Sequence, residues 1–277
     1  MPRRLRDIVV ILAVVSLFGA TLLHLFAGLS TVLYLPEYVH TLFVFADIVL
    51  MLYFGYVGFK RHSKPIWLLA LLQLLLYVVV LATNSHAVED EIISDSLSSF
   101  MYLIINGVGG VIIIYALRYI ESEDASRLKR NGFIALLLGF LGVMNFIVST
   151  NNIETFFLLY ELTTLCSFLL IGFRGDDLSF ANASRALWMN QIGGVAILLA
   201  LIGAITTYET VYFNVLLEKA DALILAPIVL EFLRDIAEDD DRTAVGNRGD
   251  GRHDRKKRTV FVYEIVLNFS ALSIVKG

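Results

Sequence analysis

Long uninterrupted apolar segments dominate this sequence, and their length limits the possible folds more than any other feature. Several last about 20 residues, the length that a helix needs to cross about 30 Å of hydrocarbon at about 1.5 Å per residue. Backbone polar groups inside lipid must be satisfied within the element, so these segments must be helical. We therefore predict an all-α, polytopic transmembrane helix bundle. Seven full spans are expected at residues 8–29, 40–59, 65–83, 99–120, 131–150, 153–173 and 182–207, with a partial eighth at 222–233.

Lysine and arginine occur in alternate connections between these segments. They precede the first predicted span and recur between spans two and three, four and five, and six and seven. The connections at 30–39, 84–98 and 150–152 contain neither residue. Because cytoplasmic loops of membrane proteins are enriched in Lys and Arg, this alternation predicts a cytoplasmic N-terminus. Lys219 is the one exception on the predicted outer side.

The composition argues against a soluble domain and against several kinds of catalytic site. Hydrophobic residues make up 57% of the chain and charged residues only 17%, whereas a globular domain carries about 25% charged residues. The single cysteine, Cys166, excludes an intrachain disulfide and a cysteine-based metal cluster. The sequence contains no nucleotide-binding loop, nucleophile–base arrangement or haem-ligand pair. We therefore expect no cofactor, no metal site and no nucleic-acid partner, and a stand-alone enzyme is disfavoured.

The character of the sequence changes near residue 234. Charged residues become frequent from Arg234 onward and include an acidic run at 239–241 and a basic run at 255–258. Such blocks are typical of a disordered or solvated tail. We predict three regions. They are three N-terminal transmembrane helices at 1–94, a transmembrane core at 95–233 and a charged tail at 234–277.

Ionisable residues at membrane depth are costly, so each is a candidate for function. Glu161 is the strongest candidate because it lies near the middle of a predicted span. A lone carboxylate there would be neutral, and a nearby cation or water would allow it to exchange a proton near physiological pH. We favour this proton relay over the alternative, a protonated acid that only hydrogen-bonds a neighbouring helix.

Other polar residues in the predicted spans are supporting candidates. Glu154 precedes Glu161 by seven residues, so it lies on the same helix face about 10 Å away, and we expect a solvated carboxylate at the outer interface. Asp47 is expected to pair with a polar group on another helix, and His24 to lie at the interface. Intramembrane amides hold helices together or order water for proton transfer. They are Asn106, Asn145, Asn190, Gln191 and Gln73.

Two segments carry a specific pattern. The first is Asp95-Ser96-Leu97-Ser98, and the second, residues 157–173, reads Phe-Leu-Leu-Tyr-Glu-Leu-Thr-Thr-Leu-Cys-Ser-Phe-Leu-Leu-Ile-Gly-Phe. With a weaker continuation at 186–196, they resemble the antiporter-like subunits of respiratory complex I. Related subunits occur in multisubunit Na⁺/H⁺ antiporters and in energy-converting membrane hydrogenases.

The resemblance implies a role for Glu161 and a set of partners. Glu161 would be the family's buried glutamate, which pairs with a lysine on a later, broken helix and drives a proton or cation half-channel. Gly194 falls where some members carry an acidic residue, so this chain departs from the pattern there. The implied partners are other membrane subunits, the lipid bilayer and H⁺ or Na⁺. The implied location is a prokaryotic plasma membrane, and redox chemistry would belong to other subunits of an NADH:quinone oxidoreductase-type translocase.

The C-terminal part departs from the family. Members continue beyond the region equivalent to 222–233 into the broken helix and a second inverted repeat, and this sequence does not. We therefore expect a truncated or frameshifted product of an antiporter-like subunit. Two functions stay open. One is a proton-translocating subunit, and the other is a non-transporting structural membrane subunit or a remnant of such a protein.

Overall fold

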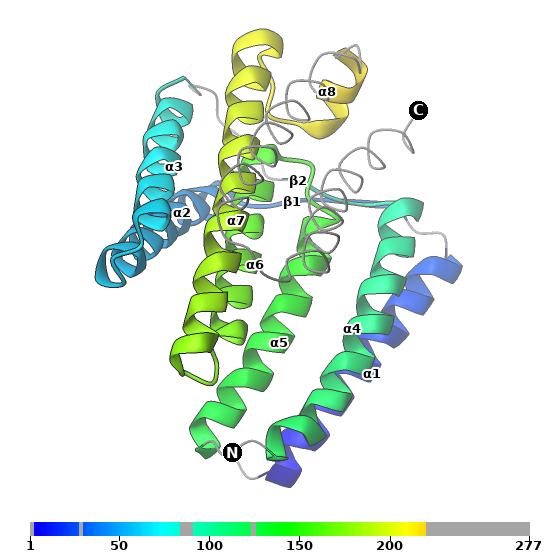
Figure 1. Cartoon of the computed structure of the whole chain (residues 1–277). Coiled ribbons are helices and arrows are strands. Elements are labelled where there is room, and N and C mark those ends of the chain that lie inside the picture. The colour runs from blue at the N-terminus through cyan, green and yellow to red at the C-terminus, as the bar shows by residue number, and fades with distance from the viewer. Residues whose placement is uncertain (1–2, 28–29, 84–90, 123–125, 220–277) are drawn as a thin grey trace, which may run out of the picture. The chain divides into compact units, whose positions relative to one another are not determined.

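The structure is a computed structural model that describes residues 3–27, 30–83, 91–122 and 126–219. Seven of the described helices are long and apolar enough to span a membrane (Figure 1), which confirms the predicted polytopic helical fold and its seven full spans. The predicted partial eighth span at 222–233 and the tail at 234–277 lie outside the described residues. The seven helices are α1 (Arg3–Ala27), α2 (Glu37–Lys60), α3 (Lys64–Thr83), α4 (Ser96–Ser122), α5 (Arg127–Ile147), α6 (Ile153–Ile171) and α7 (Asp177–Gly203).

The chain divides into two compact units, and the seven long helices belong to the first, Met1–Thr206. A π-helical segment, Ala204–Tyr208, continues α7. The second unit begins at Thr207, and its described part contains the short helix α8 (Phe213–Lys219). Just before α8, the side-chain oxygen of Thr210 accepts a hydrogen bond from the main-chain N–H of Tyr212 at 3.2 Å.

Buried apolar side chains in the first unit form two clusters, and each cluster joins its own group of helices. The first holds α1, α4 and α5 together. The second holds α2, α3, α6 and α7 together. Helix α6 contacts helices of both groups, since it packs against α5 as well as α7 and α2. It is also the most deeply buried of the seven, because 61% of the residues in its most apolar stretch are buried inside the protein. A polar side chain at the middle of α6 is therefore enclosed by protein.

Two short strands connect the groups and were not predicted. Strand β1 (Thr31–Tyr34) follows α1, and β2 (Glu91–Ser94) precedes α4; they pair antiparallel with Thr31 opposite Ser94. The segment before α6 joins them, because the main-chain N–H of Ile93 donates to Ser149 O at 2.7 Å. These connections lie between the apolar spans, and their backbone groups are satisfied by pairing with one another.

Capping side chains define where two of the helices begin. Asp95 precedes α4, and its Oδ1 accepts hydrogen bonds from the main-chain N–H of Ser98 at 2.7 Å and from its hydroxyl at 2.8 Å. Asn152 caps α6 by accepting from the main-chain N–H of Glu154 at 2.9 Å. Both satisfy helix N–H groups that have no partner within the helix. These two side chains therefore determine where α4 and α6 begin.

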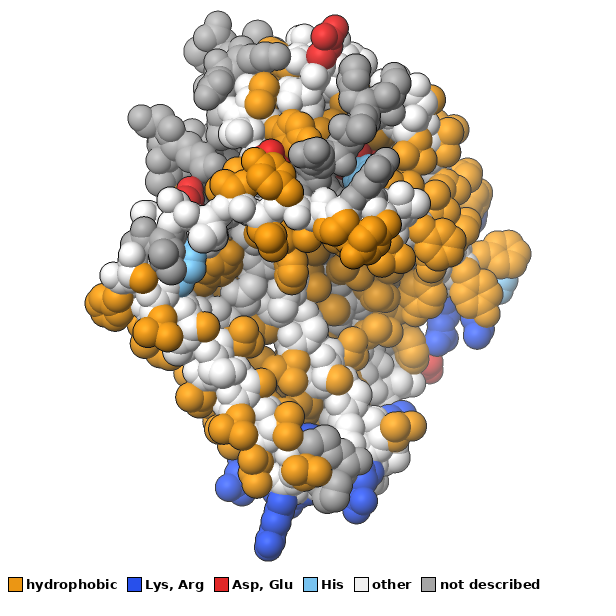
Figure 2. Space-filling view, turned by 180° about the vertical axis from the view of Figure 1, so that it is seen from behind, with side chains coloured by type: hydrophobic (Ala, Val, Ile, Leu, Met, Phe, Trp, Pro, Cys, Tyr) orange, Lys and Arg blue, Asp and Glu red, His pale blue; other side chains and the backbone are white. Residues whose placement is uncertain are grey.

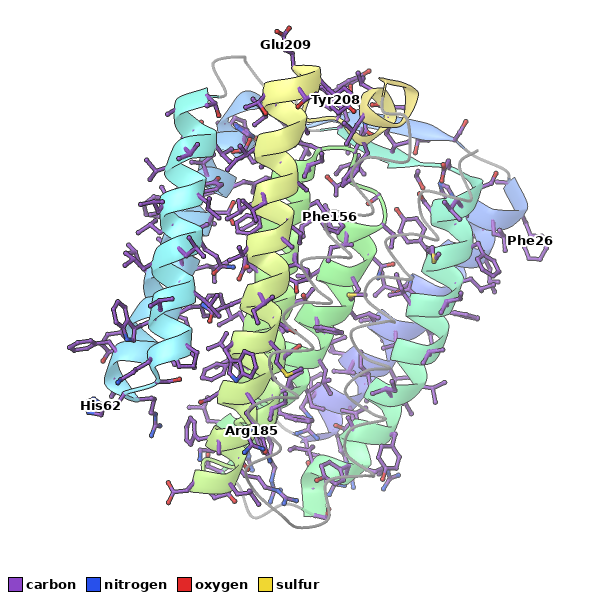
Figure 3. The ribbon with its side chains drawn as sticks, turned by 45° about the horizontal axis from the view of Figure 1, so that its top comes forward. Phe26, His62, Phe156, Arg185, Tyr208 and Glu209 are labelled. Atoms are coloured by element: carbon purple, nitrogen blue, oxygen red, sulfur yellow. The ribbon has the colours of Figure 1, made fainter. Side chains whose placement is uncertain are left out.

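Basic residues gather at one end of the first unit. The buried guanidinium of Arg6 lies 2.8 Å from a carboxylate oxygen of Glu121, and Arg130 lies 3.0 Å from the other oxygen. These contacts join α1, α4 and α5. Lys and Arg side chains are prominent at this end in the space-filling view (Figure 2). His62 and Arg185 lie toward one end of the helices, and Phe26 lies toward the other (Figure 3).

Candidate functional site: a carboxyl group enclosed by three helices

Glu161 lies near the middle of the 19-residue helix α6, and its side chain is fully buried. The amide nitrogen of Gln73, on α3, donates a hydrogen bond to Glu161 Oε1 at 2.9 Å. The same nitrogen donates to the main-chain oxygen of Gln191, on α7, at 3.3 Å. One amide group therefore joins α3, α6 and α7 around the carboxyl group.

Two adjacent glycines on α7 make room for this arrangement. A Cβ atom at Gly194 would overlap Nε2 of Gln73 and Oε1 of Glu161. A Cβ atom at Gly193 would overlap the hydroxyl of Tyr160, which donates to the main-chain oxygen of Asn190 at 3.0 Å. Small residues allow helices in membranes to approach closely, and this glycine pair lets α7 approach α3 and α6. Gly194 is thus a residue of the site as well as a packing residue.

Several polar atoms around Glu161 are buried and without a hydrogen-bond partner among the described residues. They are Oε2 of Glu161, Oε1 of Gln73 and both side-chain amide atoms of Gln191. Nor does any described lysine or arginine pair with Glu161. A buried charge without a cationic partner costs several kcal/mol even after relaxation. With a single amide donor, this carboxyl group is more stable neutral unless a further group or ion supports its charge.

A second polar group lies one helical turn from Gln73 along α3. The hydroxyl of Tyr77 is 3.2 Å from Asp47 Oδ2 and 3.3 Å from Glu154 Oε1. The prediction that Asp47 pairs with a polar group on another helix is confirmed. The expectation of a solvated Glu154 is wrong, because only 3% of its surface is exposed within the protein. The reason is that Tyr77 reaches from α3 to the first turn of α6 and covers this carboxyl group.

Sequence reasoning missed Tyr77 and gave Gln73 only a minor role. A signal was available, because residues four apart on a helix share a face. The two residues therefore mark a polar stripe on an otherwise apolar span, Lys64–Thr83. What the sequence could not supply was the identity of the helices that this stripe faces.

The remaining candidates make their hydrogen bonds elsewhere. The amides of Asn145 and Asn106 bond each other twice at 2.9 Å, and Asn106 also donates to Thr21. This cluster joins α1, α4 and α5 rather than the helices around Glu161. His24 lies 2.8 Å from the Ser99 hydroxyl through Nδ1 and 3.2 Å from the Ser94 hydroxyl through Nε2. Among the described residues, no group of His, Cys, Asp and Glu is arranged to hold a metal ion.

Comparisons with known proteins give consistent matches. Residues 81–129 match the family model described as NADH-ubiquinone oxidoreductase (complex I), chain 5 N-terminus. Over 142 residues, or 51% of this chain, the sequence is 32% identical to NAD(P)H-quinone oxidoreductase subunit 5, chloroplastic, of Piper cenocladum, of which the match covers 19%. Over 137 residues, or 49% of this chain, it is 28% identical to Na(+)/H(+) antiporter subunit A1 of Staphylococcus haemolyticus, of which 17% is covered.

The protein of the same name from Staphylococcus aureus is 31% identical over 109 residues, which are 39% of this chain and 13% of that protein. The chain thus spans less than a fifth of the length of each of these relatives. All of these matches are to subunits of membrane complexes, and the seven helices that are long and apolar enough to span a membrane are consistent with them. The chain is therefore similar to the N-terminal part of complex I chain 5 and, over a comparable length, to subunit A1 of Na(+)/H(+) antiporters.

Proposed function

We propose that this protein is a proton-translocating membrane subunit of a multisubunit complex, and that Glu161 carries the proton across the middle of the bilayer. The observation that supports this role is the environment of its carboxyl group. It is fully buried among α3, α6 and α7, accepts one amide hydrogen bond from Gln73 and has a second oxygen without a partner among the described residues. Intramembrane ionisable residues of this kind mark ion pathways.

The chemistry follows from the cost of charge at this position. As a neutral acid, Glu161 keeps its hydrogen bond with Gln73 and carries no desolvation penalty. As a carboxylate, it needs a compensating cation or water beside Oε2, because a single amide donor does not offset the cost of a buried charge. A group or ion that arrives and leaves would therefore drive release and uptake of the proton.

The proposed partners and orientation follow the same reasoning. The relatives are named as subunits of NAD(P)H-quinone oxidoreductase and of Na(+)/H(+) antiporters, so we propose assembly with further membrane subunits. The basic end that contains Arg6 and Arg130 would face the cytoplasm, because Lys and Arg are retained on that side. The strands β1 and β2 would then lie at the outer face. A prokaryotic plasma membrane is the proposed location.

A non-transporting structural role is the alternative. The hydrogen bond from Gln73 to Glu161 also joins two helices, and a permanently neutral acid would serve that purpose without moving a proton. This alternative makes a different prediction. Replacing Glu161 by Gln would keep a neutral amide in the same place and would leave ion flux unchanged.

Ion flux through the protein, assembled with its native membrane partners in liposomes, decides between the two. A pH-sensitive dye inside the vesicles reports proton movement after an ion gradient or electron donor is applied. We expect Glu161→Gln to reduce the flux to the level of empty vesicles. The matched control is Glu209→Gln, which removes an exposed carboxyl group and should leave the flux intact. Equal flux in wild type and Glu161→Gln would refute the proposal, and so would a wild-type assembly that moves no protons.

A further inference from the structure

The polar stripe on α3 contains Tyr77, whose hydroxyl contacts two carboxyl groups other than Glu161. Tyr77 is completely buried, and its ring stacks on Phe157 with the ring centroids 5.9 Å apart. Its hydroxyl lies between two carboxyl groups from different helices, Asp47 on α2 and Glu154 on α6. Asp47 is 1% exposed and Glu154 is 3% exposed. Three groups that ordinarily prefer water are thus enclosed together.

The number of available hydrogens limits what this contact can be. A tyrosine hydroxyl has one hydrogen to donate and two lone pairs with which it accepts. Ionised carboxylates only accept hydrogen bonds. Both contacts, at 3.2 Å and 3.3 Å, can therefore be separate two-centre hydrogen bonds only if one carboxyl group is protonated and donates to the tyrosine oxygen. Two ionised carboxylates would leave one of them facing a lone pair.

The surroundings of the two carboxyl groups indicate which one holds the proton. Glu154 lies in the first turn of α6, where exposed N–H groups and the helix dipole stabilise negative charge. Asp47 lies in the interior of α2, far from either helix end, and its Oδ1 is buried with no partner among the described residues. No described lysine or arginine pairs with Asp47. An ionised Asp47 would therefore have only the Tyr77 hydroxyl to support it.

We propose that Asp47, Tyr77 and Glu154 form a second proton-binding site, in which one proton resides on Asp47 and is shared through the Tyr77 hydroxyl with Glu154. Transfer across this site is a paired shift. Asp47 gives its proton to the Tyr77 oxygen while the Tyr77 hydroxyl gives its own proton to the Glu154 carboxylate. One O–H bond breaks and one forms at each step, so the tyrosine ends neutral and the negative charge moves from Glu154 to Asp47.

The site has a defined place beside Glu161. Gln73, which bonds Glu161, and Tyr77 are four residues apart on α3, about 6 Å along the helix axis. Further titratable groups on the packed elements include Glu161 and Tyr160 on α6, and His40, which lies two turns before Asp47 on the same face of α2. A negative charge that moves between Asp47 and Glu154 would change the cost of ionising Glu161. That consequence rests on the proposed transport function, whereas the shared proton does not.

Infrared difference spectroscopy of the intact protein in lipid tests the shared proton directly. A protonated carboxyl group has a carbonyl band that is separate from carboxylate bands and shifts slightly in D₂O. At neutral pH we expect Asp47→Asn to remove one such band. Tyr77→Phe keeps the stacked ring but removes the hydroxyl, so the Asp47 band should move to higher frequency as its hydrogen bond is lost. Glu161→Gln is the control, which should leave the Asp47 band in place.

Each result supports or overturns the proposal. An unchanged protonated-carboxyl region in Asp47→Asn means that Asp47 is ionised and the site does not exist. A band that is lost in Asp47→Asn but unaffected by Tyr77→Phe means that the tyrosine does not share the proton. If Asp47→Asn fails to fold, Tyr77→Phe still answers the question against the wild type. Flux that requires Glu161 while the Asp47 band is absent would refute this site and leave the proposed function standing.

Discussion

Adding a single methyl group at Gly194 should disrupt the carboxyl site from the side of α7. In Gly194→Ala the new Cβ overlaps both Gln73 Nε2 and Glu161 Oε1, so these two buried side chains must shift and their hydrogen bond is strained or broken. Overpacking of a tight interior costs about 1–3 kcal/mol. An unsatisfied buried polar group costs about 1–3 kcal/mol more. The higher helix propensity of alanine offsets only about 1 kcal/mol of this loss. The net loss of unfolding free energy is therefore about 1–5 kcal/mol.

A control on the same helix isolates this effect. Gly203 is the last residue of α7, and apart from its chain neighbours and the backbone of its own helix, no described atom lies within 4 Å of the position that its Cβ would occupy. Gly203→Ala should therefore keep or slightly raise stability. Denaturant unfolding of both variants in detergent, followed by the fluorescence of the chain's two tryptophans, measures the difference. We expect at least about 1 kcal/mol between them. Equal stability of the two variants would refute the close approach of α3, α6 and α7 at Gly194.

Three further predictions concern the ends of the helices. Arg6→Met leaves a carboxylate of α4 without its buried partner and should cost about 1–3 kcal/mol in denaturant unfolding, whereas Arg4→Met, at an exposed position, should change stability by less than about 0.5 kcal/mol. Asp95→Ala removes the cap of α4 and should lower the unfolding free energy by about 1 kcal/mol; an unchanged midpoint would contradict the capping role. Hydrogen bonding with Ser179 lowers the pKa of Asp176, so its contribution is present above the ordinary aspartate pKa and is lost as the pH falls through the lowered value. Hydrogen exchange at the start of α7, after correction for the intrinsic pH dependence of exchange, should therefore accelerate at acid pH in wild type but not in Asp176→Asn.

The sequence alone was sufficient for the spans and for the principal candidate residue, for physical reasons. A membrane requires long apolar segments whatever their neighbours are, so the seven described spans and their approximate limits could be predicted from length and composition. Glu161 could be found because a carboxyl group at membrane depth is rare. A cap such as that of Asp95 on α4 depends on only a few residues along the chain, so it has a local sequence signal.

What could not be predicted depends on contacts between distant segments. Strand β1 is four residues long, and its partner β2 lies two spans later, so neither carries a local signal. The roles of Gln73 and Tyr77 depend on α3 packing beside α6 and α7, and a single sequence does not specify which helices are neighbours. Glu154 was misjudged for the same reason. Its position near a helix end predicted solvent, whereas the Tyr77 side chain reaches it from α3 and it is buried.

The pairing of β1 with β2 also restricts how the two helix groups can move. Strand β1 connects α1 to α2, and strand β2 connects α3 to α4. Each strand therefore links a helix of one group to a helix of the other. Tilting one group against the other would shear the main-chain hydrogen bonds of this strand pair, whereas the Arg6–Glu121 contact at the basic end lies within the first group and does not join the two groups. The strand pair therefore acts as a fixed pivot. Any rocking of α1 and α4 against α2 and α3 should open the molecule at the basic end and leave the other end closed.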